Sequence, residues 1–290
     1  MLCCGSGCIP DQRCFMDESD IEQIEINLLL DAVAQRYGYD FRNYARASIE
    51  RRVRSLCRSN GSRYLAEMLP ELLRDASFLE KVIREFSVTV TDMFRDPFVY
   101  RSIREQVVPM LKTYPYIKVW VAGCATGKEA YSIAILLMEE GLYDRSVIYG
   151  TDFNDIALEQ SKKGVYSLER MDTFCANYQQ AGGTATLTDY ITLTEEGCVV
   201  KEKVKKNITF ANHNLVTDNV FGEMHLILCR NVLIYFNKIL QRRVLNILRD
   251  SLVFDGFFCL GSKESLRFSG LEKEMKVINE RARIYQKKTL

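Results

Sequence analysis

A glycine-rich turn is the part of the sequence best suited to binding a small ligand. Residues 123–127 (GCATG) follow the apolar run IKVWVA and precede a helical pattern. In an open α/β sheet, ligands bind outside the carboxyl ends of the strands, and the first strand-to-helix turn is the usual nucleotide cradle. We expect these glycines to allow close approach of the backbone and to leave amide hydrogens free for a ligand. A purely structural tight turn is the alternative.

Asp152 ends the next β-rich run, SVIYGTD, and favours an adenosine ligand. A carboxylate there can accept hydrogen bonds from both ribose hydroxyls, although it could instead cap a helix starting near Asn154. Neither GxGxxG nor GxxxxGK[ST] occurs, so a cofactor without phosphate is favoured. S-adenosylmethionine fits, with Asp152 for its ribose and Glu129 for its cationic methionine end. A charge in a first helical turn can also be only a dipole partner.

The elements that must position these residues fall into two parts. Apolar residues recur at three- and four-residue steps from Asp17 to Phe86, which predicts helices, with Ser19 as a cap of the first. After Tyr116, short β-rich runs alternate with helical stretches, which indicates a parallel sheet covered on both faces. We therefore predict an α/β fold, a doubly wound Rossmann-like sheet preceded by a small all-α domain.

The predicted boundaries follow from these changes of pattern. Between residues 165 and 206, threonines, β-branched residues and glycines interrupt the alternation and indicate a small antiparallel β insertion. The divisions are a disordered tail (1–16), a helical domain (17–86), a linker and helix beside the cofactor pocket (87–116, with the helix at 97–112) and a cofactor-binding domain (117–290). The predicted strands are 117–123, 146–152, 208–211, 225–229 and 257–260, and the helices between them 128–140, 154–163 and 238–252.

Composition restricts the class of protein. With 47% hydrophobic and 27% charged residues the chain is typical of a globular protein, and no apolar run approaches the roughly 20 residues of a membrane span. Its 39 basic and 38 acidic side chains give a net charge of +1, so no global field recruits nucleic acid or anionic lipid. The first residues do not read as a secretory signal. We therefore expect a cytoplasmic protein without membrane insertion.

Ten cysteines in such a chain indicate reduced thiols rather than disulfides. Cys3, Cys4, Cys8 and Cys14 lack a paired CxxC spacing, so we predict a disordered terminus and no metal site, with zinc as the alternative.

Several separated motifs, in order, resemble the chemotaxis receptor glutamate O-methyltransferases, the CheR family. The resemblance covers nearly the whole chain from about residue 20, and the combination of CRNVLIYF with TDMFRDP is its most specific part. The motifs are SVTVTDMFRDP (87–97), VWVAGCATGKEAYSIA (119–134), GTDFN (150–154), KKGVYS (162–167), FANHNL (210–215) and LILCRNVLIYF (226–236).

The resemblance implies a class I methyltransferase that uses S-adenosylmethionine, esterifies receptor glutamates and releases S-adenosylhomocysteine. The catalytic residues it implies are Arg95, Tyr235 and Arg230. The cofactor-binding residues are Thr89, Thr91, Arg95, Gly123, Ala125, Gly127, Glu129, Asp152, Phe153, Asn214, Leu215, Arg230 and Asn231. The chain departs from many relatives at Lys128, where they have an acid, at Ala130, where they have proline, and at Thr89, where they have asparagine.

A basic stretch is the expected contact for acidic chemoreceptor helices, although such a run is often only a solvated helix face. It consists of Arg42, Arg46, Arg51, Arg52, Arg54 and Arg58. No NPPY or DPPY motif occurs, so we do not expect a nucleic-acid substrate. RNA is the alternative partner for the basic stretch. The insertion at 165–206 resembles the family's β-subdomain, which in some members docks a receptor tail peptide. A methyltransferase with another acceptor and a non-catalytic cofactor sensor are the alternative functions.

Overall fold

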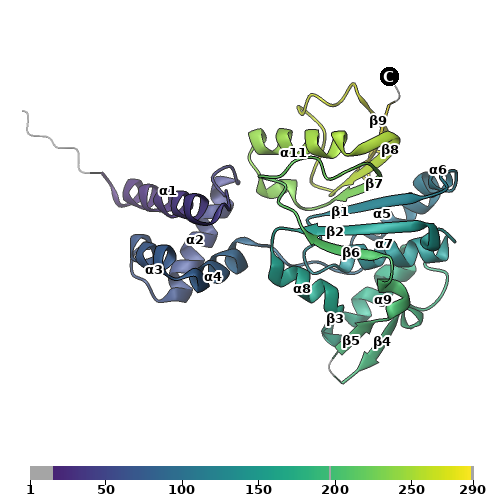
Figure 1. The fold of residues 1–290 in the computed structure, drawn as a ribbon, viewed down its shortest axis with the longest axis horizontal. Coiled ribbons are helices and arrows are strands. Elements are labelled where there is room, and N and C mark those ends of the chain that lie inside the picture. The colour runs from purple at the N-terminus through teal and green to yellow at the C-terminus, as the bar shows by residue number, and fades with distance from the viewer. Residues whose placement is uncertain (1–15, 196, 289–290) are drawn as a thin grey trace, which may run out of the picture.

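The chain folds into a small helical domain beside a larger α/β domain (Figure 1). The computed structural model describes residues 16–195 and 197–288. The predicted two-part α/β architecture is confirmed. The predicted tail and its four cysteines lie outside the described residues, except for Met16. Among the helices that the structure describes, none is long and apolar enough to cross a membrane.

The helical domain encloses a core of its own. The first helix begins after Asp17, whose side chain accepts a hydrogen bond from the Asp20 amide at 2.8 Å, so the predicted cap at Ser19 is wrong. Gly38 ends this helix in the left-handed conformation, with a φ of 79°. The domain consists of α1 (Glu18–Tyr37), α2 (Arg46–Asn60), the 3₁₀ turn η1 (Leu65–Met68), α3 (Leu69–Arg74) and α4 (Ala76–Phe86).

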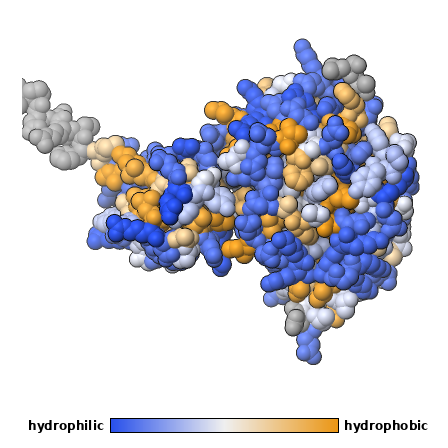
Figure 2. Space-filling view, viewed as in Figure 1, coloured by the Kyte–Doolittle hydropathy of each residue, from blue (hydrophilic) through white to orange (hydrophobic). Residues whose placement is uncertain are grey.

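The outer face of α1 is unusually apolar. Ile21, Ile24 and Leu28 are each between 43 and 50% exposed, although Ile26 and Leu29 of the same helix are fully buried. In Figure 2, hydrophobic residues gather over this helix, whereas the visible face of the α/β domain is mainly hydrophilic.

The α/β domain is built on a seven-stranded sheet with the order β6-β2-β1-β7-β8-β10-β9. The first five strands in this order are parallel, as predicted, and β10 runs antiparallel between β8 and β9. The last two strands were not predicted. The strands are β1 (Ile117–Ala122), β2 (Ser146–Asp152), β6 (Ile208–Asn212), β7 (Met224–Cys229), β8 (Leu252–Leu260), β9 (Met275–Asn279) and β10 (Ile284–Lys287).

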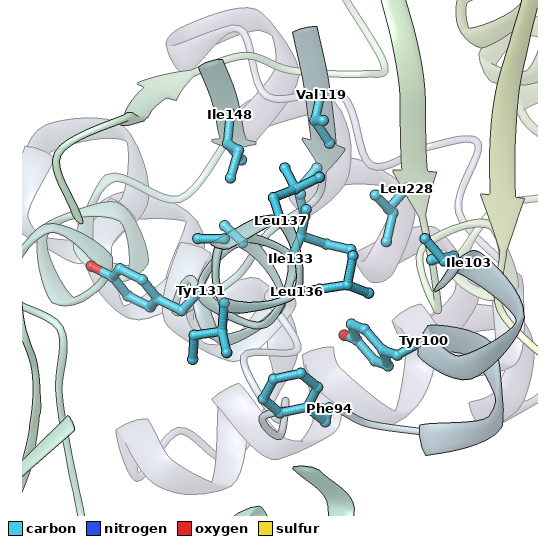
Figure 3. Packing of buried hydrophobic residues seen from close by; sticks show 14 of the residues in the cluster. Phe94, Tyr100, Ile103, Val119, Tyr131, Ile133, Leu136, Leu137, Ile148 and Leu228 are labelled. Carbon is cyan, nitrogen blue, oxygen red and sulfur yellow. The ribbon is translucent and has the colours of Figure 1, made fainter. Parts of the chain in front are cut away.

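Helices cover both faces of the sheet because side chains alternate along the strands. Val119 of β1 packs on the face covered by α7 (Lys128–Glu139), and Trp120 packs on the face covered by α11 (Lys238–Asp250). Figure 3 shows Ile133 and Leu136 of α7 between the strands and the rings of Phe94 and Tyr100. The central strands β1 and β7 are therefore buried on both sides. A third covering helix is α8 (Asp155–Lys163), and η3 (Tyr143–Arg145) precedes β2.

The helix predicted for residues 97–112 exists but widens in its middle. The Val108 amide donates to the Ile103 carbonyl, which is the spacing of a π-helix. Pro109 follows directly, has no amide hydrogen and cannot make the α-helical bond to residue 105. The segment consists of α5 (Pro97–Ser102), the π-helical η2 (Ile103–Val107) and α6 (Val108–Leu111).

The predicted β insertion is a separate antiparallel sheet with the order β3-β5-β4. It also contains α9, which was not predicted and which buries Phe174 and Tyr178 on one side. Its elements are β3 (Val165–Tyr166), η4 (Leu168–Arg170), α9 (Met171–Gln180), η5 (Leu187–Asp189), β4 (Ile191–Thr194), β5 (Gly197–Val200) and α10 (Glu202–Lys205).

Candidate active site

Two adjoining cavities lie where β1, β2 and β7 end. We call them the Asp152 cavity, of about 660 Å³ with its open mouth, and the Arg95 cavity, of about 450 Å³. Almost all of the predicted site residues line one or both of them. Thr89, Asp152, Phe153, Asn214 and Leu215 line the first; Thr91, Arg95, Glu129 and Arg230 line the second; Gly123, Ala125, Asn231 and Tyr235 line both.

Gly127 is the predicted site residue that lines neither cavity. A Cβ atom added to it would lie 2.8 Å from the Cβ atom of Ser161, and its φ is +80°. The glycine is therefore required where the turn packs against α8.

Most of the backbone amides of the glycine-rich turn are not free, contrary to our expectation. Those of Gly123 and Cys124 both donate to the Thr151 carbonyl at 2.8 Å. The Ala125 amide donates to Oδ2 of Asp152, also at 2.8 Å. The turn therefore uses these amides to attach itself to β2, because a buried amide without a partner is costly.

Asp152 does more than end a strand. Its Oδ1 accepts a hydrogen bond from the Asn154 amide at 3.0 Å, in addition to the bond from Ala125. Burial raises the pKa of Asp152 above its ordinary value, against the effect of these amides. Asn154 caps α8 with its own side chain, so the alternative role of Asp152 as the helix cap is excluded. The carboxylate lines the cavity with further acceptor capacity.

The far wall of the Asp152 cavity combines apolar and amide groups. Leu215 is 7% exposed, and the side-chain oxygen of Asn214 accepts a hydrogen bond from the Val216 amide at 3.0 Å. His213, which we did not predict, also lines this cavity. Its Nε2 lies 3.1 Å from the Asn219 carbonyl oxygen, and its buried Nδ1 has no partner among the described residues.

A buried ion-pair network forms the wall of the Arg95 cavity. The Arg230 side chain, 1% exposed, bonds Oε1 of Glu129 at 2.5 Å and Oδ2 of Asp96 at 2.8 Å. Burial opposes the charge of Arg230, but Glu129, Tyr100 and Cys259 together outweigh it, so the pKa of Arg230 is raised above its ordinary value. The buried Nε of Arg230 has no partner among the described residues.

The loop that carries Arg95 is held in a rare conformation. Phe94 and Asp96, on either side of it, have φ values of 51° and 56°. Arg230 donates to the Arg95 carbonyl at 3.1 Å, and Ser132 accepts a hydrogen bond from the Phe94 amide at 2.9 Å. In the part of the chain that the structure describes, the Arg95 guanidinium has no hydrogen bond or ion pair. The loop therefore presents an available cation to the cavity, and such strain is typical of functional sites.

Comparison with known proteins identifies the family. The family model described as "CheR methyltransferase, SAM binding domain" matches residues 89–284, and "CheR methyltransferase, all-alpha domain" matches residues 24–87. The chain belongs to the CheR methyltransferase family. It is 43% identical to a Pseudomonas putida protein named Cher3 over 264 residues, which covers 91% of this chain and 97% of Cher3. A chemotaxis protein methyltransferase of Listeria monocytogenes is 28% identical over 239 residues, covering 81% of this chain and 87% of that protein. Another, of Vibrio parahaemolyticus, is 30% identical over 234 residues, covering 72% and 78%.

The described residues fit the S-adenosylmethionine that this family binds. The cofactor has ribose hydroxyls, an adenine edge and an amino-acid end that need buried polar partners. The Asp152 cavity offers a carboxylate and the unpartnered Nδ1 of His213, and the Arg95 cavity offers Glu129 and the unpartnered Nε of Arg230. The protein is thus a methyltransferase whose cavities match its cofactor in chemistry.

The helical domain of this CheR protein completes the Asp152 cavity. Tyr44 and Phe86, neither of which we predicted, line it. Tyr44 forms an antiparallel bridge with Phe236, and their rings lie 5.0 Å apart. Phe153 packs edge-on against Phe41 at 5.9 Å. Because these contacts join residues far apart in the chain, no local pattern could have indicated them.

Glu264 is a further residue that sequence reasoning missed. Its Oε2 accepts hydrogen bonds from the amides of Asn231 at 3.0 Å and Gly261 at 2.6 Å. Asn231 is left-handed, with a φ of 61°. Burial raises the pKa of Glu264 above its ordinary value, against the effect of these amides. Glu264 thus fixes the turn that carries Asn231 and Arg230.

The predicted basic stretch is not one continuous free surface. Arg42 pairs with Asp31 and Asp40, Arg46 with Glu50, and Arg54 with Glu22 and Glu50. Arg52 is only 8% exposed, so little of its side chain is accessible to a receptor helix.

Arg51, Arg52 and Arg58 line an open groove, and Arg52 is its buried member. Residues 87–90 line the same groove, and Thr89 and Val90 continue into the two cavities. The basic groove therefore leads to the candidate active site.

Lys128, the departure from many relatives, faces away from the cavities. Its Nζ donates to the Thr126 hydroxyl at 3.0 Å and lies 4.4 Å from the ring centroid of Tyr166 in β3. Tyr166 also donates to the Thr126 carbonyl at 2.6 Å. Lys128 therefore fastens the β insertion to the glycine-rich turn.

Proposed function

We propose that this enzyme esterifies glutamate side chains of chemoreceptors in the cytoplasm, giving glutamate methyl esters and S-adenosylhomocysteine. The observation that carries the proposal is the junction of the two cavities. There the unpaired Arg95 guanidinium lies in one cavity with the buried Glu129–Arg230 pair, and Tyr235 borders both cavities. Relatives named chemotaxis protein methyltransferases support the choice of acceptor.

In the proposed complex, this chain holds the cofactor through residues of both cavities. Asp152 accepts hydrogen bonds from the ribose hydroxyls, and Glu129 faces the amino group. The adenine is surrounded by Phe153, Asn214 and Leu215. Thr89, Thr91, Gly123, Ala125 and Asn231 complete the wall. When bound, S-adenosylmethionine supplies a methyl group on a cationic sulfur.

The acceptor needs no general base. An unperturbed glutamate has a pKa of about 4.3 and is already ionised at neutral pH. Opposite charges are neutralised as the methyl group is transferred, so a cavity that excludes water favours the transition state. Alignment of the two reactants then supplies several kcal/mol. The work left to the protein is to exclude water and to orient the carboxylate.

Arg95 is the residue we assign to that orientation, assisted by Tyr235. The guanidinium can hold a carboxylate in a defined direction. Arg230 has the same charge, but its bonds to Glu129 and Asp96 hold it in the wall. Its role in the proposed mechanism is to fix the Arg95 loop.

The receptor helix is expected to reach the site along the groove of Arg51 and Arg58. Acidic receptor helices complement these two arginines, which have no ion pairs with the described residues. The open edge of the antiparallel sheet, at β4, is the proposed place for a receptor tail peptide, since an edge strand offers unpaired backbone groups.

A label-release assay tests this function. The enzyme is incubated with methyl-labelled S-adenosylmethionine and chemoreceptor-bearing membranes, and the products are then treated with alkali. Carboxyl esters release volatile methanol, whereas methylated amines keep the label. Alkali-stable label would exclude ester formation, and cofactor binding without any label would favour a sensor.

Variants of two nearby arginines test the assignment of Arg95. Arg95→Ala is expected to lower the transfer rate about 10- to 100-fold, because a group that orients a reactant typically contributes this much. Arg101→Ala, on the adjacent helix but outside both cavities, is the matched control. Full transfer by Arg95→Ala with normal cofactor affinity would remove Arg95 from the mechanism.

A further inference from the structure

A short segment of the helical domain is attached directly to the Tyr235 turn. The Ala45 amide donates to the Tyr235 carbonyl at 2.7 Å, and the Asn237 amide donates to the Asn43 carbonyl at 2.9 Å. The side chains of Asn43 and Asn237 are also hydrogen-bonded, at 3.1 Å. The backbone of Tyr235 is therefore held by a domain that lies far away in the sequence.

The side chain of Tyr235 meets the same domain through Arg52 of α2. The guanidinium carbon of Arg52 lies 5.5 Å from the centroid of the Tyr235 ring, which is within cation–π distance. Arg52 itself is fixed, because it donates to the Glu85 carbonyl at 2.8 Å and to the Ser48 hydroxyl at 3.3 Å.

Burial of the Arg52 side chain costs free energy, because a charge is removed from water. In the described part of the chain no carboxylate lies within ion-pair distance of it, and burial lowers its pKa from the ordinary value. A buried charge without a charged partner is disfavoured, and an apolar side chain would fill the same space at lower cost. Both Arg52 and its neighbour Arg51 line the basic groove, but Arg51 is exposed, whereas Arg52 is buried and lies over the Tyr235 ring. The two adjacent arginines therefore have different roles.

We propose that Arg52 is a positioning residue for Tyr235, so that the helical domain sets the place of the tyrosine hydroxyl at the junction of the two cavities. This inference rests on the proposed function, in which Tyr235 assists the orientation of the acceptor. The helical domain is then part of the catalytic apparatus as well as a docking surface.

A double-mutant cycle tests the proposal. Arg52→Met is expected to lower kcat for receptor methylation about tenfold, with the KM for receptor and the Kd for S-adenosylhomocysteine little changed. In the Tyr235→Phe background the same change is expected to have almost no further effect. Arg74→Met, an exposed arginine of the helical domain that lines neither cavity nor the basic groove, is the matched control and is expected to leave kcat and the receptor KM unchanged.

Two additional measurements keep the test decisive. Arg52→Lys retains the charge but not the planar fork, so it addresses the case in which Arg52→Met does not fold, and we expect it to recover only part of kcat. Fluorotyrosine placed at position 235 gives a ¹⁹F resonance that Arg52→Met is expected to shift, whether or not the enzyme is active. Additive losses in the cycle, a raised receptor KM or an unchanged resonance would each overturn the role of Arg52. If the wild-type enzyme forms no alkali-labile ester, the proposed function is wrong. The ¹⁹F resonance at position 235 would still show whether Arg52 contacts Tyr235.

Discussion

Replacing Asp152 by asparagine separates its two roles in this structure. The carboxylate accepts one amide hydrogen on each oxygen, from Ala125 at 2.8 Å and from Asn154 at 3.0 Å. An asparagine side chain has one acceptor oxygen, so one of these amides would face its NH₂ group. The ribose hydroxyls would also lose a charged acceptor, and a hydrogen bond to a charged group contributes about 1.5–3 kcal/mol.

The expected loss of cofactor affinity is therefore roughly 10- to 100-fold, because about 1.4 kcal/mol corresponds to a factor of ten. The stability of the fold is expected to fall by less, since the substitution also removes the cost of burying a charge, which is the cause of the raised pKa of Asp152.

Isothermal titration with S-adenosylhomocysteine measures the affinity, and urea unfolding measures the stability. Asp155→Asn is the matched control, because Asp155 is exposed and lines neither cavity. If the Kd of Asp152→Asn for S-adenosylhomocysteine is within twofold of the wild-type Kd, the carboxylate only anchors the backbone. The proposed contact between Asp152 and the ribose would then be wrong.

Three further changes test other parts of the structure. Gly127→Ala is expected to lower the free energy of unfolding by about 2–4 kcal/mol, because a left-handed φ and the contact with Ser161 both oppose a Cβ atom; unchanged urea unfolding would refute this packing role. Glu129→Gln leaves Arg230 buried with less compensation and is expected to cost about 2–4 kcal/mol in the same assay, whereas no loss would show that the pair does not stabilise the apoprotein. Burial lowers the pKa of His225 in the folded protein below its ordinary value of 6.5. The neutral side chain therefore contributes to the free energy of unfolding above pH 6.5, and this contribution is lost as the pH falls through the pKa of the folded state. In urea unfolding between about pH 7.5 and 5, the free energy of unfolding should fall more steeply with decreasing pH for the wild type than for His225→Gln. Equal pH dependence of the two proteins would contradict this prediction.

The sequence was sufficient to predict most of the walls of the two cavities. Short β-rich runs followed by helical stretches locate the ends of β1 and β2, and parallel strands bring those ends to one edge of the sheet. Gly123 and Asp152 are therefore adjacent by topology, without any knowledge of the fold beyond strand order. Arg230, directly after β7, was predicted from the resemblance to the CheR family.

What the sequence could not predict depends on contacts between distant segments. Tyr44 lines the cofactor cavity only because the helical domain bridges to Phe236. Arg52 and Arg51 have the same side chain and adjacent positions, yet one is buried against Tyr235 and the other is exposed. The amides of the glycine-rich turn were expected to be free, but those of Gly123, Cys124 and Ala125 donate to Thr151 of β2 and to Asp152.

The site of methylation on a purified receptor fragment is the measurement that tests the central claim most directly. The enzyme, the fragment and S-adenosylmethionine are incubated, and the proteolytic peptides are sequenced by tandem mass spectrometry. We expect single added methyl groups on glutamate side chains, removed by mild alkali and absent from the Arg95→Ala reaction. Methyl groups on nitrogen atoms, or an unmodified fragment with an enzyme that binds its cofactor, would contradict the account.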